Sequence, residues 1–248
     1  MATHTTQGGG GYARKFHIGR ENGQSDKNGR PYFFEWLQNL PEDKTNRKFE
    51  TRTNAENTQR HYELFAALDG FLFNVDENVM SFNGTQRNER WLVLSMIDVN
   101  EEYRIEVGKM DSRWSMDIMK RLLDPNFNPN FKLRISPFSI TTDGKTQMGL
   151  AAISGVDGKL VAKFDSPHLA GMPQAEQATF KGETLWNFEP VANWLFEQVK
   201  AKVCPRLTSD PITRPIGAPI VPMPAPAPTP PAAKFPANEM DTNDDLPF

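Results

Sequence analysis

The stretch WLVLSMIDVNEEYRIEVGKMDSRWSMDIMKRLLDP, residues 91–125, decides the fold because its hydrophobic period changes midway. Residues 91–97 are apolar enough for a buried strand. Residues 103–107 alternate apolar with charged side chains, which is typical of a half-buried strand. Residues 114–123 then carry apolar side chains at helical spacing. The stretch therefore predicts two strands followed by a helix.

Strands predicted on either side complete a five-strand unit. One runs over residues 62–75 and bends at a glycine, and two more cover residues 131–140 and 148–153. Asp111 or Ser112 is the expected cap of the helix between them. Three strands, a helix and two strands is the order of the OB-fold, a five-stranded, partly open barrel. We therefore expect a mainly β protein with an OB-fold barrel and a helix between strands three and four. Another small β-barrel or sandwich with one helix is the alternative.

Further secondary structure is predicted before and after this five-strand unit. Residues 12–18 and 31–37, joined by a turn at Asn28-Gly29, predict an N-terminal β-hairpin extension. Residues 41–60 are polar and charged, and we expect a mobile or ligand-ordered segment there. A C-terminal helix is predicted from about Pro190 to Val203, with an apolar stripe that packs on the barrel. Self-association through this stripe is the other interpretation.

Composition changes sharply at Pro205. Between Pro205 and Pro236 lie 11 of the 20 prolines, and such a run favours an extended spacer without helix or sheet. The sequence therefore predicts four parts: 1–59, a basic and aromatic extension packed on the barrel; 60–204, the OB-fold with its C-terminal helix; 205–238, a disordered Pro-rich linker; and 239–248, an acidic tip. An SH3-type ligand is the alternative for the proline run.

Charge is spread unevenly along the chain. The net charge is −3, yet residues 1–60 hold ten Lys/Arg against seven Asp/Glu, and residues 239–248 hold four acids and no base. Binding depends on local potential, so a basic front and an acidic end are compatible with nucleic acid. The single cysteine, the lack of a signal peptide and the lack of a long apolar segment favour the cytoplasm and no membrane contact.

No enzyme is expected. The four histidines form no metal-binding pair, and the chain has neither a serine elbow nor a dinucleotide fingerprint. We therefore predict no catalytic residue, no metal and no cofactor, although dispersed acidic ligands of a nuclease remain a minor alternative.

Binding of single strands without sequence preference needs cations along the phosphates and aromatic rings that stack on bases. In an OB-fold these lie on strands 2–3 and in the loops joining strands 1–2 and 4–5. The N-terminal extension supplies further cations and rings. The candidate contacts are Arg14, Lys15, Tyr32, Phe34, Trp36, Lys44, Arg47, Lys48, Arg52, Arg87, Arg90, Trp91, Arg104, Lys132, Arg134 and Lys145.

The last five residues form a peptide ligand. Asp244 and Asp245 precede an apolar Leu246-Pro247-Phe248, and Phe248 carries the terminal carboxylate. A terminal phenyl ring fits an apolar pocket, and its carboxylate pairs with Arg or Lys at the rim. Position by position, this ending resembles the acidic tip of bacterial single-stranded DNA-binding proteins. The resemblance implies that the tip recruits replication, recombination and repair proteins.

The body is more similar to the single-stranded DNA-binding proteins of tailed bacteriophages, over roughly residues 60–165. Residues 134–138 and 143–145 carry this looser resemblance. It implies a phage protein with a host-like tip, acting in the host cytoplasm. We therefore expect sequence-independent binding and protection of single-stranded DNA, with host or phage partners recruited through the tip. A strand-annealing or recombination mediator, and an adaptor for RNA or protein, stay open as alternatives.

Overall fold

The structure, a computed structural model, describes most of the chain before the proline run. The described residues are 14–20, 29–54, 56–81, 88–98, 101–142, 145–154, 158–161, 163, 165–180 and 183–207, some at strand ends by their backbone alone. The predicted linker beyond Leu207 and the tip at residues 239–248 lie outside them.

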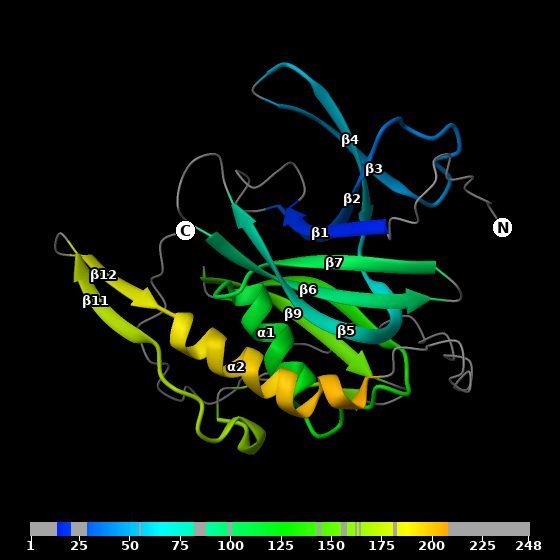
Figure 1. Ribbon diagram of the computed structural model, residues 1–248. Coiled ribbons are helices and arrows are strands. Elements are labelled where there is room, and N and C mark those ends of the chain that lie inside the picture. The colour runs from blue at the N-terminus through cyan, green and yellow to red at the C-terminus, as the bar shows by residue number, and fades with distance from the viewer. Residues whose placement is uncertain are drawn as a thin grey trace.

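The protein is mainly β, with one ten-stranded sheet at its centre (Figure 1). The predicted succession of three strands, a helix and two strands is present in the middle of the chain. Its elements are β5 (Leu68–Ser81), β6 (Asn88–Asp98), β7 (Glu101–Lys109), α1 (Arg113–Leu122), β8 (Leu133–Thr142) and β9 (Lys145–Ser154). These strands lie side by side in the order β9-β8-β5-β6-β7. In the described residues β7 and β9 are not paired, so the sheet stays open and the expected barrel is not closed.

Helix α1 covers the place where these two edge strands would meet, since it contacts both β7 and β9. Ser112 caps the helix, as predicted, by accepting a hydrogen bond from the Ser115 backbone N–H. Asp117, one turn further on, accepts the backbone N–H of Leu150 in β9 at 2.7 Å. A helix carboxylate thus occupies the position that a neighbouring strand carbonyl would take.

Four N-terminal strands extend the sheet beyond β7. They are β1 (Arg14–Arg20), β2 (Pro31–Leu37), β3 (Lys48–Thr53) and β4 (Gln59–Phe65), and they continue the order as β7-β1-β2-β4-β3. The predicted hairpin is confirmed, because β1 and β2 pair antiparallel. Strand β1 also pairs in parallel with β7, so the hairpin is part of the main sheet. In Figure 1, β2, β3 and β4 rise above β5, β6 and β7.

Two expectations for this region were wrong. Residues 41–60 are not a segment without structure of its own, because they contain β3, which pairs with β4 along its whole length. The strand expected at residues 62–75 is two strands, separated at Ala66-Ala67. Strand β4 pairs with β2 and β3, and only β5 belongs to the five-strand unit.

The C-terminal part lies against α1. The predicted helix is present as α2 (Glu189–Lys202), and it packs beside α1 under the sheet (Figure 1). Val191, Leu195 and Val199 bury its apolar stripe in the core, which confirms the expected packing. The sequence reading missed a separate hairpin before α2. The remaining elements are β10 (Gly158–Lys159), η1 (Pro167–Leu169), β11 (Glu176–Phe180), β12 (Glu183–Asn187) and η2 (Cys204–Arg206).

A single core joins the sheet to both helices, with Phe33, Leu94, Ile118 and Leu195 fully buried in it. In the described part of the chain, no helix is both long and apolar enough to span a bilayer.

Lys120 of α1 is a buried charged side chain whose pKa shift makes a testable pH effect. It is 4% exposed, and burial lowers its pKa from 10.5 to about 8, against an opposing attraction from Asp117. Between these two values the unfolded chain binds more protons than the folded protein, so the free energy of unfolding rises with pH.

We expect Lys120→Met to remove this rise of the free energy of unfolding with pH. Between pH 8 and pH 10, the free energy of unfolding of wild type should increase by about 2 kcal/mol relative to that of the variant, as measured by urea unfolding. Lys202→Met, at an exposed position on α2, should keep the wild-type profile. Parallel profiles for wild type and Lys120→Met would contradict the prediction.

Candidate nucleic-acid interface

One face of the N-terminal half of the sheet gathers rings and cations from five adjacent strands. Side chains alternate between the two faces of a sheet, so the register decides which of them share a face. His17 pairs with Phe34, and Trp36 pairs with Tyr62, which places these four on one side. We call this side the aromatic face. Its residues are Lys15 and His17 of β1; Tyr32, Phe34 and Trp36 of β2; Lys48, Glu50 and Arg52 of β3; Arg60 and Tyr62 of β4; and Glu102, Arg104 and Glu106 of β7.

The rings of the aromatic face form a continuous row across β1, β2 and β4. His17 stacks on Phe34 with centroids 5.5 Å apart, and Phe34 meets Tyr62 edge-on at 5.4 Å. Such ring pairs are each worth about 0.5–1.5 kcal/mol beyond their buried area. Trp36 lies opposite Tyr62, two residues along β2 from Phe34, and is 59% exposed, the most exposed large hydrophobic side chain of the described residues. An exposed indole beside a fixed row of rings is a ready stacking surface.

Cations surround the rings. Lys15 and Arg104 lie opposite each other on β1 and β7, and Arg60 lies on β4. Lys48 stands over the Tyr32 ring, with its ammonium 4.6 Å from the centroid. With Arg52, five Lys/Arg face three glutamates. Arg104 is exposed and has no ion pair among the described residues.

Two of these acids are already engaged. Glu106 is buried, 3.2 Å from His17 Nδ1 and 3.8 Å from the Lys15 ammonium. Burial lowers the pKa of His17, which outweighs the attraction of Glu106. Glu50 is bound by Arg52. Among the described residues of the aromatic face, Lys and Arg therefore outnumber Glu by five to three.

The opposite face of the same strands carries structural ion pairs. Arg14 binds both oxygens of Glu35, with Nε 2.9 Å from Oε1, and Arg47 binds Glu63, with Nε 2.7 Å from Oε1. The Glu35 carboxylate raises the pKa of Arg14 further above its usual range. These two arginines, predicted as DNA contacts, hold the sheet together instead of facing the ring row.

Arg14 also lines an open pocket of about 540 Å³ on this opposite face. Phe16, Phe65 and Tyr103 contribute rings to it. Asp69, Asp98 and Glu101 contribute carboxylates, which outnumber the one lining cation. Arg14 pairs with Glu101, while Lys132 and Arg134 pair with Asp98 and Asp69, so the described cations at this pocket are already engaged and leave no positive surplus for a polyanion.

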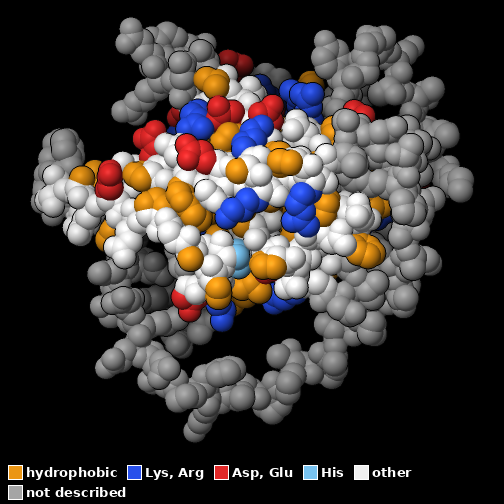
Figure 2. Space-filling view, turned by 60° about the horizontal axis from the view of Figure 1, so that its bottom comes forward, with side chains coloured by type: hydrophobic (Ala, Val, Ile, Leu, Met, Phe, Trp, Pro, Cys, Tyr) orange, Lys and Arg blue, Asp and Glu red, His pale blue; other side chains and the backbone are white. Residues whose placement is uncertain are grey.

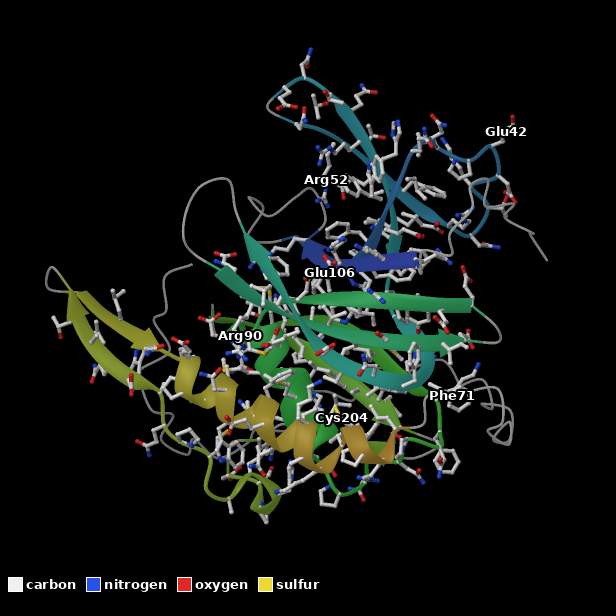
Figure 3. All side chains as sticks on the ribbon, in the orientation of Figure 1. Glu42, Arg52, Phe71, Arg90, Glu106 and Cys204 are labelled. Carbon is white, nitrogen blue, oxygen red and sulfur yellow. The ribbon has the colours of Figure 1, made fainter. Side chains whose placement is uncertain are left out.

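Several predicted contacts lie elsewhere. Arg90 binds Glu77 and the Asn193 side chain of α2, so it ties the sheet to the helix; in Figure 3 it lies far from Arg52. Lys132 and Arg134 pair with Asp98 and Asp69 where β8 meets β5.

Four more predicted residues belong to none of these groups. Trp91 is half-buried and lies on β6, four residues before Ser95, which pairs with Arg104. Its indole N–H is buried, and no described residue accepts a hydrogen bond from it. Lys44 is exposed in the turn before β3. Arg87 and the side chain of Lys145 lie outside the described residues.

The surface on the α2 side mixes charged and hydrophobic side chains. In Figure 2, which brings the bottom of Figure 1 forward, separate Lys and Arg side chains are scattered among hydrophobic ones. Within the described residues, no group of three His, Cys, Asp or Glu could hold a metal ion.

Sequence reasoning missed His17, Arg60 and Tyr62 as members of the interface. The alternation of residues 59–65 was the available signal, because it places Arg60 and Tyr62 on one side. Residues 62–65 were instead assigned to the first barrel strand, and Arg60 to the polar segment before it. His17 gave no signal, since its role follows from the neighbours that β2 and β7 bring to it.

Comparison with known proteins gave no match: no family model, no curated protein and no solved structure is significantly similar to the chain.

Loss of the Arg14–Glu35 pair should weaken the fold. The Glu35 side chain is only 15% exposed, so Arg14→Met leaves a largely buried carboxylate unpaired. We expect a loss of about 2 kcal/mol in urea unfolding, less than the roughly 3–5 kcal/mol of a fully buried pair. The double variant Arg14→Met/Glu35→Leu should recover part of it. Arg104→Met should cost under about 0.5 kcal/mol, and equal losses for both arginines would refute the structural role.

Proposed function

We propose that this protein binds single-stranded DNA without sequence preference, through the aromatic face. The observation that carries the proposal is the row of His17, Phe34 and Tyr62 with the exposed Trp36 beside it, flanked by the exposed cations Arg60 and Arg104. Rings offer every base a stacking surface, and cations track the phosphates whatever the sequence. No base-specific group is needed for such binding.

Single strands fit this surface better than a duplex. Ring faces reach bases only where the bases are unstacked and open, and a flat sheet presents several rings to successive bases. The spacing supports this, because neighbouring strands are about 4.8 Å apart. The row therefore crosses the sheet in steps short enough for consecutive nucleotides.

We also propose that β5–β9 and α1 form an OB-fold left open at one seam. The strand order and the position of the helix support this reading. In an OB-fold the outer face of strands 2 and 3 binds the oligomer, and here those strands are β6 and β7. Arg104 of β7 lies on that face and faces Lys15 of β1 across the parallel pairing. The N-terminal strands would thus enlarge an existing binding face.

The acidic tip completes the proposal as the site for partner proteins. Its ending, Asp244-Asp245-Leu246-Pro247-Phe248, supports this role by its resemblance to the tip of bacterial single-stranded DNA-binding proteins. On this proposal the chain is a phage-type single-stranded DNA-binding protein without enzymatic activity. It would protect DNA during replication, recombination and repair in the cytoplasm.

Trp36→Ala should weaken binding of oligo-dT by about 1–3 kcal/mol, the usual value of one stacked base. Fluorescence anisotropy of a labelled oligonucleotide measures this without relying on tryptophan emission. Because Trp36 is exposed, thermal stability should hardly change. Leu185→Ala, which removes another exposed hydrophobic side chain on β12, should bind like wild type. Unchanged binding by Trp36→Ala, or no wild-type preference for oligo-dT over an equal duplex, would contradict the proposal. A parallel titration with poly-U distinguishes DNA from RNA preference.

Deleting Phe248 should leave oligo-dT affinity intact and abolish capture of replication and repair proteins, since the phenyl ring would be lost and the terminal carboxylate would move to Pro247. Pull-down from host extract with wild-type and truncated chains measures this. Equal capture of these proteins by the two chains would count against the tip as the partner site.

A further inference from the structure

Arg52 is distinguished among the cations of the aromatic face by three side-chain hydrogen bonds, which leave only the two N–H groups of Nη1 without a described acceptor. Its Nε donates to Glu50 Oε1 at 2.8 Å, and its Nη2 donates to Glu50 Oε2 at 3.0 Å and to the Arg20 carbonyl at 2.8 Å. Two bonds to one carboxylate fix the plane of a guanidinium. Few donors are left for a phosphate, and Glu50 already neutralises the charge.

The fixed guanidinium lies over the rings of the row. Its central carbon is 4.9 Å from the centroid of Tyr62 and 5.5 Å from that of Phe34. The Arg52 side chain is 23% exposed, so part of it stays accessible. Figure 3 shows Arg52 beside the upright strands β2, β3 and β4. A base approaching Phe34 and Tyr62 from solvent therefore meets Arg52.

Guanidinium groups suit this position. They are planar and weakly hydrated, and nucleobases stack on them as they stack on aromatic rings. A lysine ammonium has no plane to offer. We infer that Arg52 is a stacking surface for a nucleobase and not a phosphate contact, so that base, guanidinium and ring form a layered stack. In this arrangement Glu50 is a positioning residue, which holds the guanidinium plane without touching DNA. The inference rests on the proposed function and assigns one of its contacts.

Arg47 provides a matched control within the same hairpin. It also binds a glutamate through two bonds, to Glu63, and lies 5.0 Å from the centroid of a ring, Phe49. Phe49 and Glu63 pair on the opposite face of the sheet from Tyr62. Arg47→Lys therefore makes the same chemical change away from the aromatic face.

The test compares oligo-dT with an equally long oligonucleotide in which every nucleotide is abasic. Binding of the full chain to both is measured by anisotropy over a range of salt. For Arg52→Lys we expect at least about fivefold weaker binding to oligo-dT. The slope of affinity against salt and the affinity for the abasic strand should not change, because no phosphate contact is lost. Arg47→Lys should match wild type throughout.

Three outcomes would contradict the inference, and each is distinguishable from the others. If Arg52→Lys weakens both oligonucleotides equally and lowers the salt slope by about 0.7, Arg52 is a phosphate contact and the inference is overturned. Unchanged or tighter binding to oligo-dT would overturn it too, since Arg52 would then contribute nothing or shield the rings. If wild type binds neither oligonucleotide, the proposed function fails and this inference with it.

A second variant guards against a simple folding defect. If Arg52→Lys melts at a lower temperature than Arg47→Lys, Glu50→Gln replaces it, because this change keeps the guanidinium but loosens its clamp. It should weaken oligo-dT binding and leave the salt slope unchanged. Unchanged oligo-dT affinity in Glu50→Gln would overturn the inference.

Discussion

The parallel pairing of β1 with β7 is the contact on which the rest of the structure depends. It sets Arg14 beside Tyr103 and His17 beside Glu106, and so joins the N-terminal strands to the five-strand unit in one sheet. Parallel pairing needs a long connection between its strands, and here almost the whole N-terminal half of the chain supplies it. Without this pairing, β2, β3 and β4 would have no attachment through the sheet, and Arg104 would not lie beside Lys15.

The two faces of the N-terminal strands show how one kind of interaction serves different ends. Arg47–Glu63 and Arg52–Glu50 are both two-bond ion pairs with the guanidinium over a ring. Strand alternation alone places the first on the side of Glu63 and the second on the aromatic face. The same kind of bond that stabilises the sheet on one side holds a flat, charged group beside half-buried rings on the other.

Helix α1 accounts for the open seam between β7 and β9. It is anchored at its start by Ser112 and along its length by Asp117, which takes the Leu150 N–H. Pro137, opposite Leu150 in β8, lies two residues past the last partner of β5, where its missing N–H costs no ladder bond. At the seam, the Leu150 N–H therefore has an acceptor in Asp117 although β7 supplies none.

The sequence by itself determined the local elements whose pattern is strong. The change of period at residues 103–123 located β7 and α1, the turn signal at Asn28-Gly29 located the first hairpin, and Pro190 with Pro205 bounded α2. It also identified Tyr32, Phe34, Trp36 and Arg52 as candidate contacts, because aromatic and basic residues are conspicuous in any chain. It did not separate Arg52 from Arg14 and Arg47, which lie on the opposite face of the sheet, or from Arg90, which binds the α2 side chain Asn193, and it did not select His17 and Tyr62. Only the tertiary structure decided which of these side chains share a face, since that depends on the pairing of strands far apart in the chain, and local periodicity carries no information about that pairing.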